Sequence, residues 1–266
     1  MGEFVNPGWL TALAWGRRCC DRLAQHVAPP ADRFGVGATL MMMTTRNPDD
    51  VTAPVEDYLK VIYEIERLSG AAATTDIAHR LAIAPASVSG MVRRLAEQGL
   101  LAHERYRGVR LTDEGRRIAL RMLRRHRIIE AYLTQALGYP WDRVHDEAER
   151  LEHAASEDLI DRMAAAIGEP SVDPHGAPIP TRELKIDERS LMSLAELPPG
   201  ASGRVVRVSD DDAPRLRYLG ELGLVPGAIV RVLAQAPFGG PITLRVGSAE
   251  HQVGPGLASV VQVERG

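Results

Sequence analysis

The sequence contains little cysteine and few aromatic residues. Of its 266 residues only two are cysteines, and aromatic residues make up 5%. Cys19 and Cys20 are adjacent, so the chain has neither a disulfide framework nor a Cys-x-x-Cys zinc motif. We therefore expect a protein of a reducing, cytoplasmic environment, with cores built from Leu, Ile, Val and Ala.

Long apolar stretches and hydrolase motifs are also missing. No run of 18 apolar residues occurs, which predicts that nothing in the chain spans a membrane. Neither a His-Glu-x-x-His pattern nor a nucleophile elbow is present. With 45% hydrophobic residues, the chain is long enough for two domains with cores of their own.

The net charge of −3 is unevenly distributed. Residues 91–130 hold eleven arginines against five acidic residues, a balance of +6. Residues 142–161 hold eight acidic residues against two arginines, a balance of −6. A basic segment beside an acidic one fits phosphate binding next to cation binding.

Three segments differ in composition from the rest. Residues 1–50 are predicted to be a poorly ordered N-terminal extension. Residues 169–190 are rich in Pro, Gly and charge, which predicts a linker, with His175 as a loop residue and not a ligand. Residues 191–266 contain short β-branched runs punctuated by Gly, Pro and Asp, which predict a small SH3-like β-barrel.

Residues 74–112 have the pattern of a winged helix-turn-helix. A short helix at 75–81 and a tight connection precede a second helix that starts at Pro85 and has small, polar residues on its outer face. Small side chains let a helix press into the major groove, with arginines behind them for phosphates. A hairpin with an Arg-rich tip follows at 100–112, although a purely structural helix pair with a surface hairpin has a similar pattern. The expected DNA contacts are Ala86, Ser87, Ser89, Gly90, Arg93, Arg94, Arg105 and Arg107.

A group of acidic and imidazole side chains shares one face of the predicted helix at 141–167. An α-helix advances about 100° per residue, so four such residues fall within one arc of roughly 100°. They are His145, Glu149, Glu152 and His153. A stripe that faces a core is normally apolar, and buried carboxylates need a partner such as a divalent cation. The stripe therefore predicts a metal site, although a solvated face with i,i+4 pairs has the same spacing.

Two further predicted helices carry metal-ligating groups. His126 and Glu130 stand four residues apart on the predicted helix at 113–137. Asp57 belongs to the amphipathic segment at 54–68, where the helix dipole also favours an acidic residue near the N-terminus. Three helices that each offer a carboxylate or an imidazole favour convergence on one metal centre.

Several separated segments together resemble the diphtheria toxin repressor-like family of metal-dependent transcriptional repressors. They are EDYLKVIYEIE, AEQGLLAHERYRGVRLTDEG, RRHRIIEAYL, VHDEAERLEHAASE and DPHGAPIP, within about residues 51–265. The resemblance implies a mainly α fold with little β. Its domains would be a winged helix at 51–120, a helical dimerisation and metal-binding domain at 121–168, and an SH3-like (FeoA-like) domain at 191–266. It also implies a homodimer that binds double-stranded operator DNA, and a regulator rather than an enzyme.

The resemblance further implies two metal ions per subunit. The primary site carries over to Asp57, Glu149, Glu152 and His153. The ancillary site carries over to His126, Glu130 and His145, with a contribution from the SH3-like domain at Asp212. Arg215, where a second ligand of that domain is expected, cannot bind a metal.

Asp57 and Glu149 stand where the iron-responsive branch of the family has Met and Cys. Carboxylates are hard ligands that suit Mn²⁺, which indicates the manganese transport regulator branch. Fe²⁺ also accepts Asp, Glu and His, so an iron-dependent repressor is the alternative. Lys60 stands where the two-domain manganese regulators have Glu, which favours separate primary and ancillary ions over a dinuclear pair like theirs.

We therefore expect a Mn²⁺-activated homodimeric repressor of metal-uptake genes, in which the metal orders the DNA-binding helices. A metal-dependent hydrolase would also use paired His and carboxylate groups to activate water, but the missing hydrolase motifs argue against it. A passive metal buffer would leave the winged helix without a role.

Overall fold

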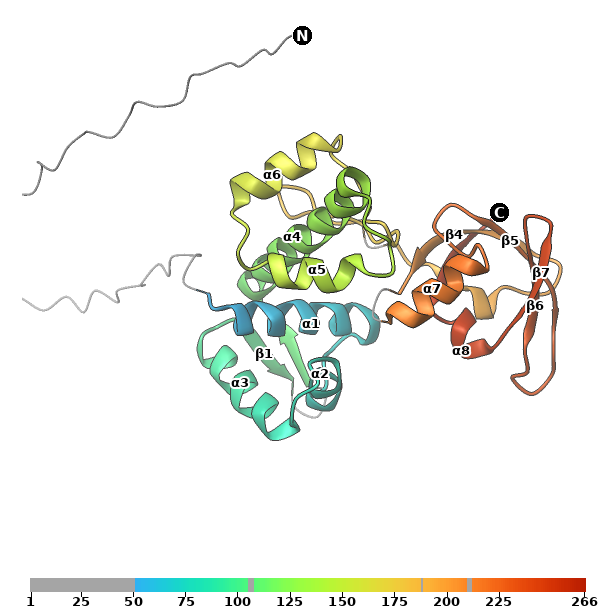
Figure 1. Ribbon diagram of the computed structural model, residues 1–266. Coiled ribbons are helices and arrows are strands. Elements are labelled where there is room, and N and C mark those ends of the chain that lie inside the picture. The colour runs from blue at the N-terminus through green and yellow to red at the C-terminus, as the bar shows by residue number, and fades with distance from the viewer. Residues whose placement is uncertain (1–50, 105–107, 188, 210–211) are drawn as a thin grey trace, which may run out of the picture. The chain divides into compact units, whose positions relative to one another are not determined.

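The computed structural model describes residues 51–266 except 105–107, 188 and 210–211 (Figure 1). The extension predicted at 1–50 and the wing residues Arg105 and Arg107 lie outside the described residues. Within them the fold is mainly α with a smaller amount of antiparallel β, as predicted from the sequence. None of the described helices is long and apolar enough to cross a membrane.

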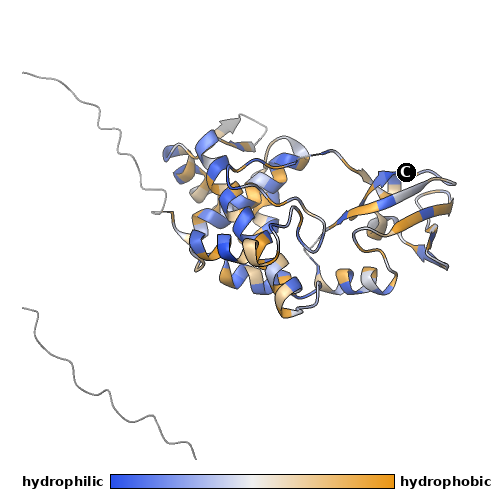
Figure 2. Ribbon diagram, turned by 90° about the horizontal axis from the view of Figure 1, so that it is seen from above, coloured by the Kyte–Doolittle hydropathy of each residue, from blue (hydrophilic) through white to orange (hydrophobic). Residues whose placement is uncertain are grey.

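The first group of elements forms the predicted helix-turn-helix with its hairpin. It comprises α1 (Ala53–Ser69), α2 (Thr74–Arg80), α3 (Pro85–Glu97), β1 (Leu101–Glu104) and β2 (Gly108–Leu111). The helices are amphipathic, with apolar and polar residues on opposite sides (Figure 2). Their apolar faces meet in one core, in which Leu59, Ile77 and Leu95 are fully buried. Gly108 allows a close approach, because a Cβ there would lie 2.2 Å from the Ala72 carbonyl oxygen.

The second group is helical and consists of α4 (Asp113–Leu137), α5 (Val144–Leu151) and α6 (Glu157–Ala166). The single helix predicted at 141–167 is therefore wrong, because the chain breaks between α5 and α6. The Ser156 hydroxyl accepts a hydrogen bond from the Leu159 amide at 3.2 Å and so caps a new helix. Glu152 and His153 consequently lie in the turn after α5, and not within a continuous helix.

The segment 169–190, predicted to be a linker, has no helix or strand among its described residues, yet its first half is packed into the helical group. His175 is fully buried and Asp173 is 4% exposed. Ile179 belongs to the core formed by α4, α5 and α6. Leu184 and Ile186 contact the core of the helix-turn-helix group.

The third group is a β domain around a single sheet. Its elements are β3 (Met192–Ser193), a 3₁₀ turn (Leu194–Glu196), β4 (Ser202–Val208), α7 (Ala213–Glu221), β5 (Ile229–Gln235), β6 (Ile242–Val246), β7 (Ala249–Val253), α8 (Pro255–Ala258) and β8 (Val261–Arg265). The strand order is β3-β8-β4-β5-β6-β7, all antiparallel. The predicted SH3-like domain is present. The sequence patterns missed β7, α7 and α8.

Candidate metal centre

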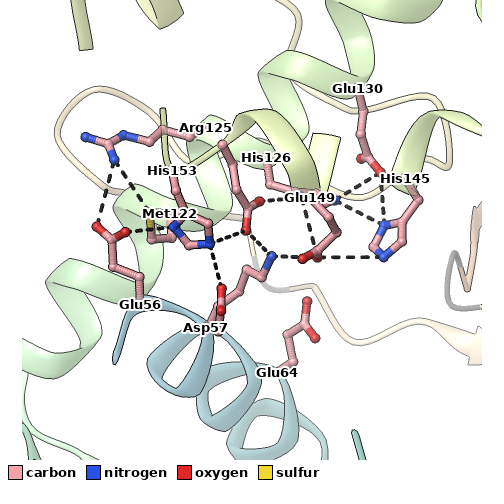
Figure 3. A network of polar contacts seen from close by, with 12 residues as sticks. Glu56, Asp57, Glu64, Met122, Arg125, His126, Glu130, His145, Glu149 and His153 are labelled. Carbon is pink, nitrogen blue, oxygen red and sulfur yellow. Dashed lines mark hydrogen bonds and ion pairs between the residues drawn. The ribbon is translucent and has the colours of Figure 1, made fainter. Parts of the chain in front are cut away.

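Three stretches of the chain bring acidic and imidazole side chains together (Figure 3). Figure 3 shows them in a row that extends from Glu56 and His153 at one end to Glu130 and His145 at the other. α1 supplies Glu56, Asp57 and Lys60; α4 supplies His126 and Glu130; α5 and the turn after it supply His145, Glu149, Glu152 and His153. The predicted convergence of three segments is therefore present, with the third one broken after α5.

The first group of potential ligands consists of Asp57, Glu152 and His153. His153 Nε2 lies 2.8 Å from Asp57 Oδ1 and 3.7 Å from Glu152 Oε1. Burial is the largest influence on Asp57 and raises the pKa of its carboxyl, although His153 and Lys60 act in the opposite direction. The charge on Asp57 is thus incompletely balanced, as expected of a carboxylate that binds a cation.

Glu56 holds the other side of the His153 ring. Its Oε2 lies 2.9 Å from His153 Nδ1, and Glu56 is 7% exposed. A carboxylate on one imidazole nitrogen fixes the ring so that the other nitrogen faces the metal. Glu56 was not predicted from the sequence. It neighbours Asp57 in α1, and nothing in the spacing distinguishes it from an exposed acidic residue of a first helical turn.

Lys60 lies between two of the predicted ligands. Its ammonium donates to Glu152 Oε1 at 2.6 Å and to Glu149 Oε1 at 2.8 Å. Burial would lower the pKa of Lys60, but the charges of Glu152 and Glu149 outweigh burial and raise it. Burial alone would also raise the pKa of Glu152, whereas its contacts with His126 and Lys60 lower it. Both shifts favour the charged forms of the Lys60 ammonium and the Glu152 carboxylate.

The second group consists of His126, His145 and Glu149. Glu149 was expected in the primary site with Asp57, Glu152 and His153, but its carboxylate lies with the imidazoles of the expected ancillary site. His126 Nε2 lies 3.1 Å from His145 Nδ1 and 3.1 Å from Glu130 Oε1. On its other side, His126 Nδ1 lies 2.6 Å from Glu152 Oε2. The buried His126 ring thus connects the first group of ligands to the second.

The electrostatics of His126 and Glu130 are coupled. Burial would lower the pKa of His126, but the carboxylates of Glu130 and Glu152 raise it to about 10. Burial would raise the pKa of Glu130, but His126, His145 and His175 hold it well below its usual value. In the absence of a metal, a proton on His126 therefore balances these buried carboxylates.

A third group consists of Glu130, Asp173 and His175, all buried. His175 Nε2 lies 2.7 Å from the Trp141 carbonyl oxygen and donates a hydrogen bond to it. Nδ1 lies 3.8 Å from Glu130 Oε2, which is too far for a hydrogen bond. His175 was predicted to be a loop residue of a linker and not a ligand. The local composition gave no indication that the His175 side chain is buried beside Glu130.

Asp212, the expected contribution of the SH3-like domain to the ancillary site, caps α7. Its Oδ1 accepts a hydrogen bond from the Arg215 amide at 2.9 Å. It belongs to none of the three groups of potential ligands found among the described residues. Its contribution to the ancillary site stays a prediction.

A metal ion fits the first and second groups by the chemistry of their side chains. All the donors are carboxylates or imidazoles, which suit Mn²⁺ and Fe²⁺. A cavity of about 580 Å³ adjoins the centre and is lined by Asp57, Lys60, His126, His145 and Glu149 among others. An ion from solvent can therefore reach both groups.

The predicted DNA-contact residues that the structure describes lie together on one face of α3. Ala86, Ser87, Ser89, Gly90, Arg93 and Arg94 are all exposed, whereas Val88, Val92 and Leu95 are buried. A Cβ added at Gly90 would have no other atom within 4 Å. The outer face of α3 is thus small, polar and open at its start and basic further along, as direct contact with a major groove requires.

Three family models match successive parts of the chain. The model described as "Iron dependent repressor, N-terminal DNA binding domain" matches residues 50–109. The one described as "Iron dependent repressor, metal binding and dimerisation domain" matches residues 112–181, and "FeoA domain" matches residues 192–265. Together these three matches cover the described helices and strands except the last two residues of β2.

Similar proteins are named for iron and for manganese. The "Iron-dependent repressor IdeR" of Mycobacterium tuberculosis (strain ATCC 25618 / H37Rv) is 33% identical over 230 residues, which are 82% of this chain and 99% of the relative. The "HTH-type transcriptional regulator MntR" of Lysinibacillus sphaericus (strain C3-41) is 36% identical over 113 residues, 42% of this chain and 81% of the relative. A solved "Manganese-dependent transcriptional repressor complex with manganese" is similar with a TM-score of 0.75 and 40% identity, covering 79% of this chain and 99% of that one.

Proposed function

The chain belongs to the diphtheria toxin repressor-like family of metal-dependent transcriptional repressors, and we propose that it is a Mn²⁺-activated member that represses metal-uptake genes. One observation carries this proposal. The candidate ligands come from α1, which belongs to the core of the helix-turn-helix group, and from α4, α5 and the turn after α5. Metal binding therefore acts on the position of the DNA-reading element.

Each ligand group has a separate task in this proposal. Asp57 from α1, with Glu152 and His153 from the turn after α5, holds the primary ion. His126, His145 and Glu149 hold the ancillary ion, with Glu130 beside them. When bound, each ion supplies a double positive charge that offsets the repulsion between these carboxylates. The ion changes DNA binding only through its higher affinity for the DNA-competent arrangement of α1.

The ligand types support manganese over iron. Asp57 and Glu149 are hard oxygen ligands, and the three ligand groups found among the described residues contain no cysteine. The alternative is an iron-dependent repressor, because the relative named for iron matches 82% of the chain. The relatives are repressors rather than enzymes, which decides against the hydrolase interpretation.

Operator binding completes the proposal. α3 would enter the major groove with Ala86, Ser87, Ser89 and Gly90 foremost, while Arg93 and Arg94 contact phosphates. Two copies of the chain would present two such helices to a two-fold operator in the cytoplasm, because the second matched domain is described as a dimerisation domain.

The decisive test is the fluorescence anisotropy of a labelled operator fragment from a manganese-uptake promoter, measured anaerobically against free Mn²⁺ and free Fe²⁺. We expect tight binding at micromolar Mn²⁺ and a weaker response to Fe²⁺ at its cellular level. Glu152→Gln should remove the metal response, whereas Asp146→Asn, at an exposed acidic residue of α5, should keep it. An equal or stronger response to Fe²⁺ would favour the iron-dependent alternative. No response to either ion would refute the proposal.

A further inference from the structure

A further cavity lies at the C-terminal end of α1. Its volume is about 450 Å³, and its walls come from α1, β2, α4, β8 and the segment before β3. None of the described residues that line it belongs to the three ligand groups of the metal centre. Arg67, in its wall, follows Asp57 by ten residues in α1, which is about 15 Å along a helix axis. The cavity is therefore separate from the metal centre, and the proposed function does not account for it.

Arginine side chains dominate the walls of this cavity. Four guanidinium groups line it, and they come from four separate parts of the chain: Arg67, Arg110, Arg116 and Arg189. Glu66 is the one acidic residue in the described lining. Its Oε1 accepts from Arg116 at 2.9 Å, and its Oε2 accepts from the Leu111 amide at 3.0 Å. Both oxygens of this carboxylate are thus already bound, and the lining keeps an excess of positive charge.

Partners within the chain balance only part of this charge. Asp187 Oδ2 lies 2.8 Å from Arg189 Nε, so Arg116 and Arg189 each have a carboxylate partner. The negative end of the α1 dipole is equivalent to about half a charge, which is less than one further guanidinium. Arg67 is half-buried and forms no ion pair with any carboxylate that the structure describes. A positive charge held partly out of solvent without an anionic partner is unfavourable, so the cavity attracts an anion.

The lining suits an anion that carries phosphate groups. A guanidinium presents parallel N–H donors that match the oxygens of a phosphate. Ser190 and Gln262 add a hydroxyl and an amide, which donate to further oxygens. The volume falls within the range of ligand pockets, about 300–1,000 Å³, and is larger than a single phosphate ion needs. Because the guanidinium groups surround a cavity, they favour a small molecule over the convex backbone of a DNA duplex.

We propose that this cavity binds a small molecule with two or more phosphate groups. The ligand is additional to the metal and the DNA of the proposed function. Arg67 and Arg110 belong to the helix-turn-helix group, whereas Gln262 belongs to β8. The bound anion therefore links the helix-turn-helix group to the β domain.

Isothermal titration calorimetry of sodium pyrophosphate into the metal-free full chain tests the site. The metal-free form is used because pyrophosphate itself binds Mn²⁺. We expect saturable binding of one pyrophosphate per chain. Inorganic phosphate should bind at least about tenfold more weakly, because it engages fewer guanidinium groups.

Two variants and a matched control locate the binding. Arg67→Gln removes a charge-assisted contact and should weaken pyrophosphate binding by about tenfold or more. Ser190→Glu adds a negative charge at an exposed position of the lining and should have an effect of the same size. Arg231→Gln removes an exposed arginine of β5 that does not line the cavity, and it should bind as the wild type does. Circular dichroism checks that each variant is folded, and if Arg67→Gln is not, Ser190→Glu decides.

The possible outcomes separate this inference from the proposed function. A wild type that binds no pyrophosphate would overturn the inference, while a normal Mn²⁺ response would leave the proposed function intact. Equal pyrophosphate affinity in the wild type, Arg67→Gln and Ser190→Glu would place the binding elsewhere and also overturn it. An equal loss in Arg231→Gln would show a general effect of charge, with the same consequence. Equal affinity for phosphate and pyrophosphate would overturn the assignment to a ligand with several phosphate groups.

Operator binding distinguishes the two sources of phosphate. Fluorescence anisotropy with Mn²⁺ compares the operator affinity of Arg67→Gln with that of the wild type. We expect equal affinities, because the inference assigns the cavity to a small molecule. Weaker operator binding by Arg67→Gln, together with no pyrophosphate binding by the wild type, would mean that the cavity contacts DNA phosphates and would overturn the inference.

Discussion

His153 is held from two sides by acidic residues of α1. Asp57 Oδ1 lies 2.8 Å from Nε2, and Glu56 Oε2 lies 2.9 Å from Nδ1. If Nε2 binds the metal, Glu56 accepts the Nδ1 proton and fixes both the tautomer and the plane of the ring. Arg125 Nη1 lies 3.8 Å from the other oxygen of Glu56. Glu56 is therefore a positioning residue in the proposed primary site.

Replacement of Glu56 tests this arrangement. Glu56→Gln keeps the shape of the side chain but weakens its hydrogen bond to His153, so we expect Mn²⁺ affinity to fall by about tenfold or more. Isothermal titration calorimetry measures the change. Glu64→Gln, on the same helix and paired with Arg80, should bind Mn²⁺ as the wild type does. Equal losses in both variants would show a general effect of charge and not of positioning.

Protons and metal ions compete for the imidazoles of His126, which is buried, and His153, which is partly exposed. Burial would lower the pKa of His153, but Glu56 and Asp57 raise it. Burial would also lower the pKa of His126, but Glu130 and Glu152 raise it to about 10. Only the neutral imidazole binds a metal. We therefore expect Mn²⁺ affinity to fall as the pH decreases, because more imidazole is protonated. Calorimetry in buffers of different ionisation enthalpy should show net proton release on binding, and the absence of release at neutral pH would contradict these assignments.

Spacing along the sequence predicted which residues belong to the centre but not their contacts. His145 and Glu149 share a helical face, and that periodicity is local information. The pairing of Lys60 with Glu152 spans 92 residues, and that of Glu56 with His153 spans 97. Such contacts depend on how α1 packs against the other helices, which no local pattern specifies. For the same reason, the burial of His175 was not predicted.

No side chain caps the N-terminus of α3, the helix that would contact DNA. Pro85 occupies its first turn, and Ala84 at the N-cap makes no side-chain hydrogen bond. Gly90 lies in the middle of the helix, where glycine costs about 1 kcal/mol relative to alanine. Nothing within the described residues approaches a Cβ at this position within 4 Å. The fold does not require glycine at this position, and a small residue there is compatible with the proposed contact with the major groove.

Substitution of Gly90 should therefore separate stability from DNA binding. Gly90→Leu places a good helix former at an open position, so we expect the free energy of unfolding to rise by about 0.5–1 kcal/mol. Operator affinity should fall by tenfold or more, because the side chain would extend toward the groove. Chemical denaturation and anisotropy measure the two effects, and Mn²⁺ affinity in the same variant serves as the control. A gain in stability with unchanged operator affinity would remove Gly90 from the DNA interface.

Element boundaries were predictable where one strong pattern continued. The predicted helix at 113–137 matches α4 because Thr112 caps it and Gly138 ends it in a left-handed conformation. The prediction of one helix at 141–167 was wrong because the helical spacing of acidic and apolar residues continues across the break between α5 and α6. Ser156, which caps α6, cannot be distinguished in the sequence from a polar surface residue. β7 was missed because its sequence, Ala249–Val253, is mostly polar and has one fully buried residue, Val253.

At the scale of the whole molecule, the metal centre joins parts of the chain that are separate in sequence. Asp57, at one end of the centre, belongs to α1. The apolar face of α1, which includes Leu59 and Ile62, lies in the core of the helix-turn-helix group. Glu152 and His153 follow α5, whose apolar face, including Val144 and Ala148, belongs to a different core. α4 contributes side chains to both cores, and an ion held by both sets of ligands would add a direct link between α1 and the turn after α5, which is the kind of coupling that a metal switch needs.

This coupling predicts where Mn²⁺ should change hydrogen exchange. A ligand that binds only the folded state stabilises it, by about 2.7 kcal/mol at a concentration 100 times its dissociation constant. We expect added Mn²⁺ to slow exchange in α1 and in the turn after α5, and to leave the β5–β6 hairpin unchanged, because that hairpin supplies no residue to the three ligand groups. Exchange measured by mass spectrometry on the full chain, with Glu152→Gln as the control, gives the comparison. Slower exchange in α5 without any change in α1 would mean that the ion binds without reaching the DNA-reading group, and the metal would then not act as a switch through α1.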